Sequence, residues 1–465
     1  EIYDLIQFRD ALILGLFSIG ISILLSFFSW LFYKNFYKAN LLAFSMICFQ
    51  FFFGPVHDLL KKTFSDSLIT RYSFILPATI ILFIFLIVFL YRSKKSFIRT
   101  TYYLNILLLI LLLIDTVNLL VKTNRKQNVA PTNVEVFNAC ENCKKPDVYL
   151  IIADGYPGKI ELRDLFNYDN SIFEGKLAKR GFHVIDSSVS NYNFTQYSIS
   201  SMLNLDYIDG LVGSNQNKHD ISICNKILRN CRTIKFFTSN EYEVFNYSIF
   251  DINKQPALTT PTFLPRKTKL ITSQTFTNRL IRNLGYHLVT TFKLESSIKQ
   301  LRNLDLNNNN KLFSLTIKNA SKNTEKPKFT YTHLMMPHHP YYFDSKGNQT
   351  PYLQLTEEHS SDKSAFLGYL EYSNKKYLEL IDQILTSSKT PPIIILMGDH
   401  GFREFKDSVD KKYHFMNLNA VYFPDSNYTG FYKGQSNINQ FRIILNSQFG
   451  QQMPLLKDSS SFLAE

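Results

Sequence analysis

Four long apolar runs near the beginning of the chain constrain its fold more than any other feature. Each is about as long as a membrane-spanning helix, which takes roughly 17–25 residues. The runs are Ala11–Tyr33, Leu41–Val56, Phe74–Tyr91 and Tyr103–Val121, and Leu59 and Leu60 could extend the second. A cleaved signal peptide would account for the first run only. We therefore expect a transmembrane helical domain over residues 1–121.

The positive charge of the chain is concentrated beside these runs. Residues 1–126 hold 13 Lys or Arg and 6 Asp or Glu, so they contribute +7 of the net +13. This distribution suits anionic lipid headgroups better than a nucleic-acid groove, so we expect a membrane partner and no nucleic acid. The basic residues at 34–38 and 92–99 lie in two short loops, which favours these loops as cytoplasmic. Both termini would then lie outside the cytoplasm.

The rest of the chain has the composition of a folded domain. Residues 122–145 are polar and irregular, which is typical of a linker, and a second domain is expected over 146–465. Four cysteines form two close pairs, Cys140/Cys143 and Cys224/Cys231. Local disulfides in an oxidising compartment are the preferred interpretation. A zinc site of four thiolates is the alternative, although the second pair lacks the usual short spacing.

Two apolar runs in this domain end in carboxylates. Ile393–Met397 follows two prolines and predicts a buried strand of a parallel sheet, and it leads directly into a Gly-Asp-His-Gly stretch with Asp399 and His400. Val148–Ala153 repeats the pattern and is followed by Asp154. Ligand sites of α/β sheets lie at the carboxyl ends of strands. Adjacent Asp and His suit a divalent ion such as zinc, and a purely structural Asp–His pair is the alternative.

Thr195 is expected at or close to the start of a helix, because Ile199, Met202 and Leu203 follow it at helical spacing. Unpaired N–H groups and the helix dipole favour anions there, so a hydroxyl at this place is well positioned to be a nucleophile. Simple capping of the helix is the alternative, and the local sequence by itself favours capping.

Histidines gather at the end of another expected strand, Lys328–Met335. His333, His338 and His339 fall within seven residues, beside two prolines. A single histidine is more often structural than a ligand, but three together with two strand-end carboxylates favour a metal or substrate site. The other expected elements are helices at Glu161–Tyr168, Ser171–Arg180, Ser273–Arg302, Asp362–Leu385 and Ile438–Phe449, strands at Phe182–Asp186, Glu243–Phe250 and Asn417–Phe423, and a loop at Asn307–Asn310.

In this order along the chain, Asp154, Thr195, His338 and the Asp399-His400 pair resemble the metal site of the alkaline phosphatase/sulfatase superfamily. The resemblance covers about residues 146–460 and includes YLIIADGYP, SNYNFTQYSISSMLNLDY, HLMMPHHPYYFD, LMGDHGF and NQFRIILNSQFGQQMPLL. A multi-span segment before such a domain is similar to phosphoethanolamine transferases and lipoteichoic acid synthases. The resemblance implies an α/β fold with a mostly parallel sheet flanked by helices, preceded by a transmembrane bundle of about four spans.

The resemblance also implies roles for particular residues. Asp154, Asp399 and His400 would bind a divalent metal, and Thr195 would be both ligand and nucleophile. His338 matches a histidine that contacts the transferred phosphate or a second metal, and it would act with Thr195 in catalysis. Weaker candidates for contact with substrate or a second metal are His333, His339 and His414. Zinc is the expected metal and manganese the alternative, with one or two ions.

The implied activity is transfer of a phospholipid-derived headgroup, phosphoethanolamine or phosphoglycerol, onto a cell-envelope glycan or glycolipid through a phospho-threonine intermediate. The alternatives are a membrane-anchored hydrolase of phosphate or sulfate esters and a non-catalytic binding module. The C/S-x-P-x-R motif of classical sulfatases does not surround Thr195, which counts against sulfate esters. Lipoteichoic acid synthases carry Glu where this chain has Asp154, and the transferases usually have five spans. The expected location is the bacterial cytoplasmic (inner) membrane, with several spans and an extracytoplasmic catalytic domain.

Overall fold

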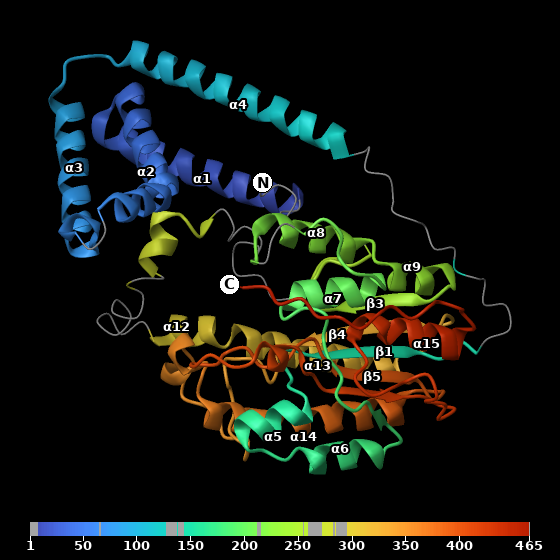
Figure 1. Ribbon diagram of the computed structural model, residues 1–465. Coiled ribbons are helices and arrows are strands. Elements are labelled where there is room, and N and C mark those ends of the chain that lie inside the picture. Colours follow the sequence, from blue (N-terminus) through green and yellow to red (C-terminus); the bar gives the residue numbers. More distant parts are fainter. Residues whose placement is uncertain are drawn as a thin grey trace. The chain divides into compact units, whose positions relative to one another are not determined.

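The computed structural model describes residues 8–64, 67–126, 137, 144–211, 215–253, 255–258, 272–281, 284 and 295–464. The chain divides into two compact units (Figure 1). One consists mainly of residues 136–260 and 296–465, and the other of residues 2–135 and 261–295. The expected domain boundaries at residues 121 and 146 stay a prediction. The helical unit also takes in residues 261–295, which the sequence analysis assigned to the second domain.

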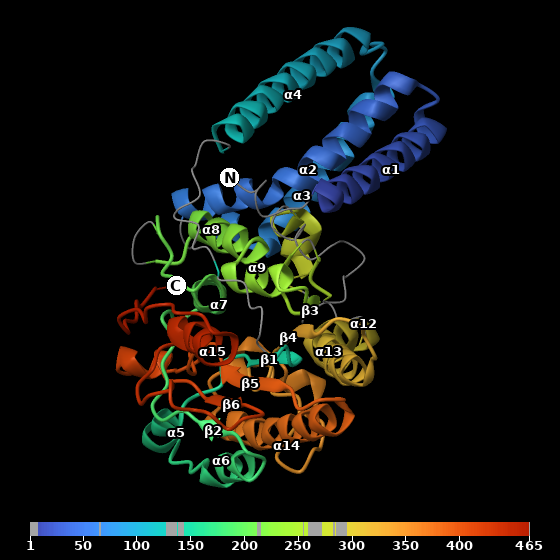
Figure 2. The ribbon, with the colours of Figure 1, turned by 90° about the vertical axis from the view of Figure 1, so that its right-hand side faces the viewer.

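Four long helices form most of the helical unit: α1 (Phe8–Tyr33), α2 (Phe36–Thr63), α3 (Tyr72–Arg92) and α4 (Ile98–Lys126). Each contains a stretch long and apolar enough to cross a membrane, as the four apolar runs predict. Helix α4 continues through residue 126 and so occupies the start of the expected linker. Figure 2 shows α1, α2 and α4 as separate long helices of this unit.

The two short basic loops lie at the same end of the helical unit. The Tyr33 hydroxyl donates to the carbonyl of Ile87 at 3.1 Å, which joins the end of α1 to the end of α3. The Lys38 ammonium donates to the carbonyl of Ser93 at 2.7 Å, just beyond α3. Both loops would therefore lie on the same side of a membrane that this unit crosses. The placing of both basic loops on one side agrees with the charge pattern.

Residues 272–281 pack against α2, although more than 200 residues separate them in the sequence. The N–H of Gly54 donates to the carbonyl of Gln274 at 2.9 Å. The ring of Phe276 lies 4.8 Å from that of Phe49, between ring centroids. Arg279 also pairs with Asp58. One or two helices are expected at Ser273–Arg302; residues 276–281 are helical, and α12 (Glu295–Arg302) is a second helical part of this range.

The second unit is built on a six-stranded sheet in the order β2-β6-β5-β1-β4-β3. Strands β1, β3, β4 and β5 are parallel, whereas β6 is antiparallel to β5 and β2 is antiparallel to β6. The expected α/β fold with a mostly parallel sheet is therefore confirmed. The strands are β1 (Val148–Ala153), β2 (His183–Val184), β3 (Glu243–Tyr247), β4 (Lys328–Leu334), β5 (Ile393–Gly398) and β6 (Asn419–Tyr422).

Helices cover both faces of this sheet, which explains why β1 and β5 are apolar throughout. Alternate residues of a strand point to opposite faces. Tyr149 and Ile151 pack in one apolar cluster, and Leu150 and Ile152 pack in another. The first face is covered by α5 (Lys159–Phe166), α6 (Ser171–Ala178), α13 (Leu304–Ser321) and α14 (Lys363–Ser387), and the second by α7 (Thr195–Asn204), α9 (Arg232–Ser239) and α15 (Gln440–Phe449).

The loop expected at Asn307–Asn310 is wrong, because these residues lie within α13. Asparagine is a weak helix former that competes for local backbone hydrogen bonds. Here a tertiary partner satisfies one of the four: the Asn309 side chain donates to the carbonyl of Met335 at 3.1 Å and accepts from its N–H at 2.8 Å. The asparagine therefore ties α13 to the end of β4.

The disulfide expected between Cys224 and Cys231 is also wrong, because both thiols are free and buried. Cys224 lies in α8 (Lys218–Arg229) and packs with Tyr192 and Leu463, whereas Cys231 packs in the larger cluster beside the sheet. Each therefore behaves as a small apolar core residue. Cys140 and Cys143 lie outside the described residues.

Candidate metal centre

The three central strands bring the predicted acidic residues to one edge of the sheet. Strands β5, β1 and β4 are adjacent and parallel, and Ala153 is in register with both Leu334 and Gly398. Asp154 and Asp399 follow the ends of β1 and β5, so their carboxyl groups meet at the carboxyl edge. Both are buried, and the N–H of Gly155 donates to Asp399 Oδ1 at 2.9 Å.

Thr195 reaches this edge from a helix and not from a strand, because it is the first residue of α7. Its hydroxyl oxygen lies 3.2 Å from Nε2 of His400, and the residue at the capping position of the helix is Phe194. The capping alternative is therefore not what the structure shows. The Ser198 hydroxyl donates to the carbonyl of Asp399 at 2.6 Å and fixes α7 to the loop after β5.

The imidazole of His400 is oriented so that a lone pair faces the two carboxylates. Its Nδ1 lies 2.7 Å from the carbonyl oxygen of Gly401, which only accepts, so Nδ1 carries the hydrogen. Nε2 then lies 3.3 Å from Asp399 Oδ2 and 4.0 Å from Asp154 Oδ1. Burial lowers the pKa of His400 and outweighs the opposing effect of Asp399, so the ring is neutral at neutral pH.

This arrangement fits a metal ion. Asp154 Oδ1 and Asp399 Oδ2 are buried and have no hydrogen-bond partner among the described residues. Two carboxylate oxygens and an imidazole lone pair that face one another repel unless a cation lies between them. Carboxylate oxygen and imidazole nitrogen are ligands of zinc, and the Thr195 hydroxyl is close enough to His400 Nε2 to complete the set.

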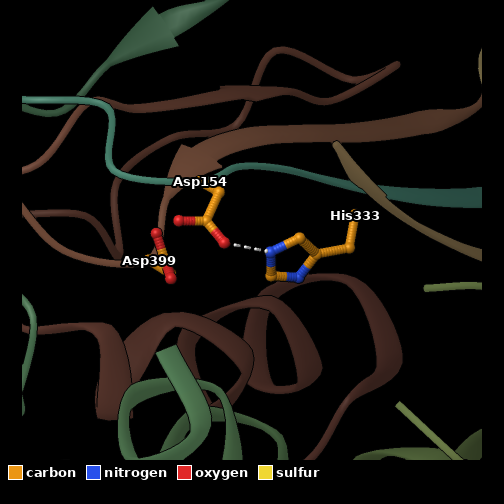
Figure 3. A group of neighbouring side chains, drawn as sticks. All are labelled: Asp154, His333 and Asp399. Carbon is orange, nitrogen blue, oxygen red and sulfur yellow. Dashed lines mark hydrogen bonds and ion pairs between the residues drawn. The ribbon is translucent and has the colours of Figure 1, made fainter. Parts of the chain in front are cut away.

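His333 contacts the second carboxylate oxygen of Asp154 (Figure 3). Its Nε2 lies 2.9 Å from Asp154 Oδ2, and the Tyr331 hydroxyl lies 2.9 Å from its Nδ1. Ligand atoms of Asp154, His333 and Asp399 all lie within 4.8 Å of one another, so the three could also hold an ion directly. With both ring nitrogens already hydrogen-bonded, the structure favours His333 as the residue that orients Asp154.

The neighbouring imidazoles keep Asp154 ionised. Burial, the largest influence, would raise the pKa of this carboxyl group. Electrostatic interactions with His338, His333 and His400 and the hydrogen bond from His333 outweigh it, and the pKa falls below its ordinary value. A carboxylate that stays ionised when buried is prepared for a cation.

His338 is a third histidine near Asp154, after His400 and His333. It lines a cavity of about 370 Å³ together with Asp154 and Thr195. Its Nδ1 donates to the carbonyl of His339 at 2.6 Å, which leaves Nε2 available. Gly155 has a φ of +65°, a left-handed conformation that favours glycine, and a methyl group there would be in ordinary contact with the rings of His338 and His400, at 3.6 and 3.8 Å.

Within the described residues, the side chains of the other two histidine candidates form no hydrogen bond or ion pair with Asp154 or Asp399, although the carbonyl of His414 accepts from the N–H of Gly401 at 2.9 Å. His339 is buried against Tyr341, with ring centroids 5.2 Å apart, and burial lowers its pKa. His414 lies between Phe405 and Phe462 and lines a second cavity, also of about 370 Å³. Burial lowers the pKa of His414 as well.

Sequence reasoning missed two residues that support the site. Tyr331 holds His333, and its place two residues before that histidine on β4 is a pattern that could have indicated it. Glu161 is fully buried in α5 and accepts a hydrogen bond from the N–H of Phe402 at 3.0 Å, beneath the Asp-His loop. Burial raises the pKa of Glu161 well above its ordinary value, so it is neutral where it supports the loop.

No protein-family model matches the sequence, and the comparison with curated proteins returned no match. Solved structures do match. The C-terminal periplasmic domain of EcEptC from Escherichia coli is 14% identical at a TM-score of 0.44, over 72% of this chain and 94% of that one. BT1596, a 2-O GAG sulfatase, is 11% identical at a TM-score of 0.41, over 68% and 73%.

A structure that includes membrane helices matches as well. The integral membrane protein lipooligosaccharide phosphoethanolamine transferase A (EptA) from Neisseria meningitidis is 11% identical at a TM-score of 0.39, over 80% of this chain and 68% of that one. At these values the matches do not assign an activity, which has to be inferred from this chain's own residues. Phosphoethanolamine transferases and a sulfatase are among the solved structures that match.

Proposed function

We propose that this protein is a membrane-bound, metal-dependent phosphotransferase that moves a phospholipid headgroup onto a cell-envelope glycan or glycolipid. One observation carries the proposal: the Thr195 hydroxyl lies 3.2 Å from His400 Nε2, in a group that includes two buried carboxylate oxygens without hydrogen-bond partners among the described residues. Asp154, Asp399, His400 and Thr195 would hold the metal. Zinc is the expected ion, and one of the matching structures is the EcEptC domain in complex with Zn.

A bound metal ion would lower the pKa of the Thr195 hydroxyl and neutralise charge on phosphoryl oxygens. Thr195, having lost its hydroxyl proton to solvent water, attacks the phosphorus of a phosphodiester as an alkoxide. A bond forms between its oxygen and phosphorus, and the bond from phosphorus to the lipid oxygen breaks. His338, in the same cavity, gives a proton to the leaving lipid alcohol. The N-terminus of α7, which begins at Thr195, would favour the negative charge of the phosphoryl group.

In the second step an acceptor hydroxyl attacks the phospho-threonine. His338 takes the proton of that hydroxyl, the phosphorus–Thr195 bond breaks, and the Thr195 oxygen is released. Water in place of the acceptor would make the protein a hydrolase. The helical unit supports a lipid donor, because anchoring in the membrane raises the effective concentration of a lipid headgroup at the membrane surface.

The four apolar helices support a location in the bacterial cytoplasmic membrane. The two basic loops at 34–38 and 92–99 lie at one end of the helical unit and support the cytoplasmic side for that end. The catalytic unit would then lie on the extracytoplasmic face.

The test uses the full chain in mixed lipid micelles with zinc or manganese. Release of fluorescent diacylglycerol is followed from labelled phosphatidylethanolamine and phosphatidylglycerol. We expect Thr195→Ala to abolish release. Thr238→Ala should leave it unchanged, because among the described residues the Thr238 hydroxyl donates only to carbonyls of its own helix. Mass spectrometry should locate the headgroup adduct on Thr195. An active Thr195→Ala variant, or an adduct on another residue, would refute the proposed nucleophile.

A further inference from the structure

Arg403 is a cationic side chain in the wall of the cavity that contains Asp154 and Thr195. No motif or spacing in the sequence indicated a role for it. It follows His400 by three residues in the loop after β5. Its guanidinium carbon lies 4.6 Å from the centre of the Phe194 ring, and Phe194 directly precedes Thr195. One side chain therefore links the metal-binding loop to the start of the nucleophile helix.

The guanidinium group of Arg403 has no ion pair or hydrogen bond within the part of the chain that the structure describes. Other arginines of this unit are engaged. Arg180 forms a two-pronged pair with Asp382, at 2.6 and 2.8 Å. Arg442 is buried and donates to the carbonyl of Pro454 at 2.7 Å. Arg403 is half-buried, and its five N–H donors are still available for an anion.

The position of Arg403 also connects two cavities. Arg403 and Phe194 line both the cavity with Asp154, Thr195 and His338 and the cavity with His414, each of about 370 Å³. A phosphodiester carries a group on each side of its phosphorus, so an anion bound beside this shared wall would have room on both sides. A planar guanidinium forms paired hydrogen bonds with phosphate oxygens, which an ammonium group cannot match in geometry.

We propose that Arg403 binds the non-bridging oxygens of the phosphoryl group and holds it against Thr195. The inference rests on the proposed function, because it takes Thr195 as the nucleophile. The aromatic ring of Phe194 keeps the guanidinium on the cavity wall. As bonds to phosphorus form and break, negative charge on these oxygens is stabilised by a preorganised cation. Arg403 is in this role a catalytic residue.

Binding of inorganic phosphate to the zinc-loaded full chain in detergent tests the inference without turnover. Isothermal titration would compare the wild-type protein with Arg403→Gln, Arg403→Lys and the control Arg163→Ala, with zinc content measured for each. Arg163 is an exposed arginine of α5 that pairs with Asp164. We expect Arg403→Gln to weaken phosphate binding about 10- to 100-fold. Arg403→Lys should recover part of the loss, and Arg163→Ala should bind as the wild type does.

Phosphate affinity that is unchanged in Arg403→Gln at equal zinc content would overturn the inference, and so would a wild-type protein that binds no phosphate. A parallel assay of diacylglycerol release separates this outcome from failure of the proposed function. If Thr195→Ala still released diacylglycerol while Arg403→Gln lost phosphate binding, the nucleophile would be wrong and the anion site would stand. If Arg403→Gln released diacylglycerol at the wild-type rate, Arg403 would have no part in the reaction.

Discussion

Replacing His333 by leucine should weaken zinc binding although His333 is not assigned as a zinc ligand. His333 Nε2 lies 2.9 Å from Asp154 Oδ2, and the two side chains are 0% and 2% exposed, so water cannot take over the contact. A hydrogen bond to a charged group contributes about 1.5–3 kcal/mol, and about 1.4 kcal/mol corresponds to a tenfold change in affinity. The expected loss is therefore about 10- to 100-fold, in the range known for residues that orient metal ligands.

The pKa of Asp154 gives this prediction a second observable. Without His333, burial is opposed by fewer favourable contacts, so the pKa of Asp154 should rise. Protons would then compete with zinc for the carboxylate, and the gap between the variant and the wild type should widen as the pH falls. Competition with a chromophoric chelator, at several pH values, measures both effects on the full chain in detergent.

Two further variants make the result decisive. His400→Leu removes a proposed ligand and should lose more affinity than His333→Leu. His183→Leu is the matched control, because His183 stacks on Tyr428 at the far edge of the sheet. Zinc affinity equal to the wild type in His333→Leu would refute the orienting role. A loss as large as that of His400→Leu would make His333 a direct ligand.

Three other predictions concern the framework of the protein. In Gly401→Ala, the new Cβ would overlap the carbonyl oxygen of Tyr413, so thermal unfolding should show a loss of stability of about 1–3 kcal/mol, and an unchanged melting temperature would contradict the close approach. In Gly54→Val, the side chain would overlap Gln274, so residues 272–281 should detach from α2 and become sensitive to protease; equal resistance would argue against the contact. Because burial raises the pKa of Glu161, its contribution to stability is lost as the pH rises from about 4.5 through the folded-state pKa, at about 1.4 kcal/mol per pH unit. Glu161→Gln stays neutral, so its stability should not show this loss between pH 5 and pH 7.5 in thermal unfolding experiments. An equal change in stability between the two pH values in both proteins would refute the prediction.

The sequence by itself determined the four apolar helices and the central strands, because these elements depend on composition over many residues. A stretch such as Ile393–Met397 is apolar at every position, so it is stable only as a strand that is buried on both faces of the sheet. Glycine and proline mark its ends. The residues that directly follow these strands could then be expected at the same edge of the sheet, because parallel strands all end there. Asp154, Asp399 and His400 could be expected together for this reason.

Only the tertiary structure decided which atoms meet. The Asn307–Asn310 run looks like a loop, but it is helical because Asn309 finds a partner on another element. Cys224 and Cys231 are close in sequence, yet each packs into a different apolar cluster. Similarly, Thr195 faces His400 and Arg403 stacks on Phe194, contacts that no periodicity encodes. The physical reason is that local patterns report burial and backbone preference, whereas hydrogen bonds and ion sites depend on residues that lie far apart in the chain.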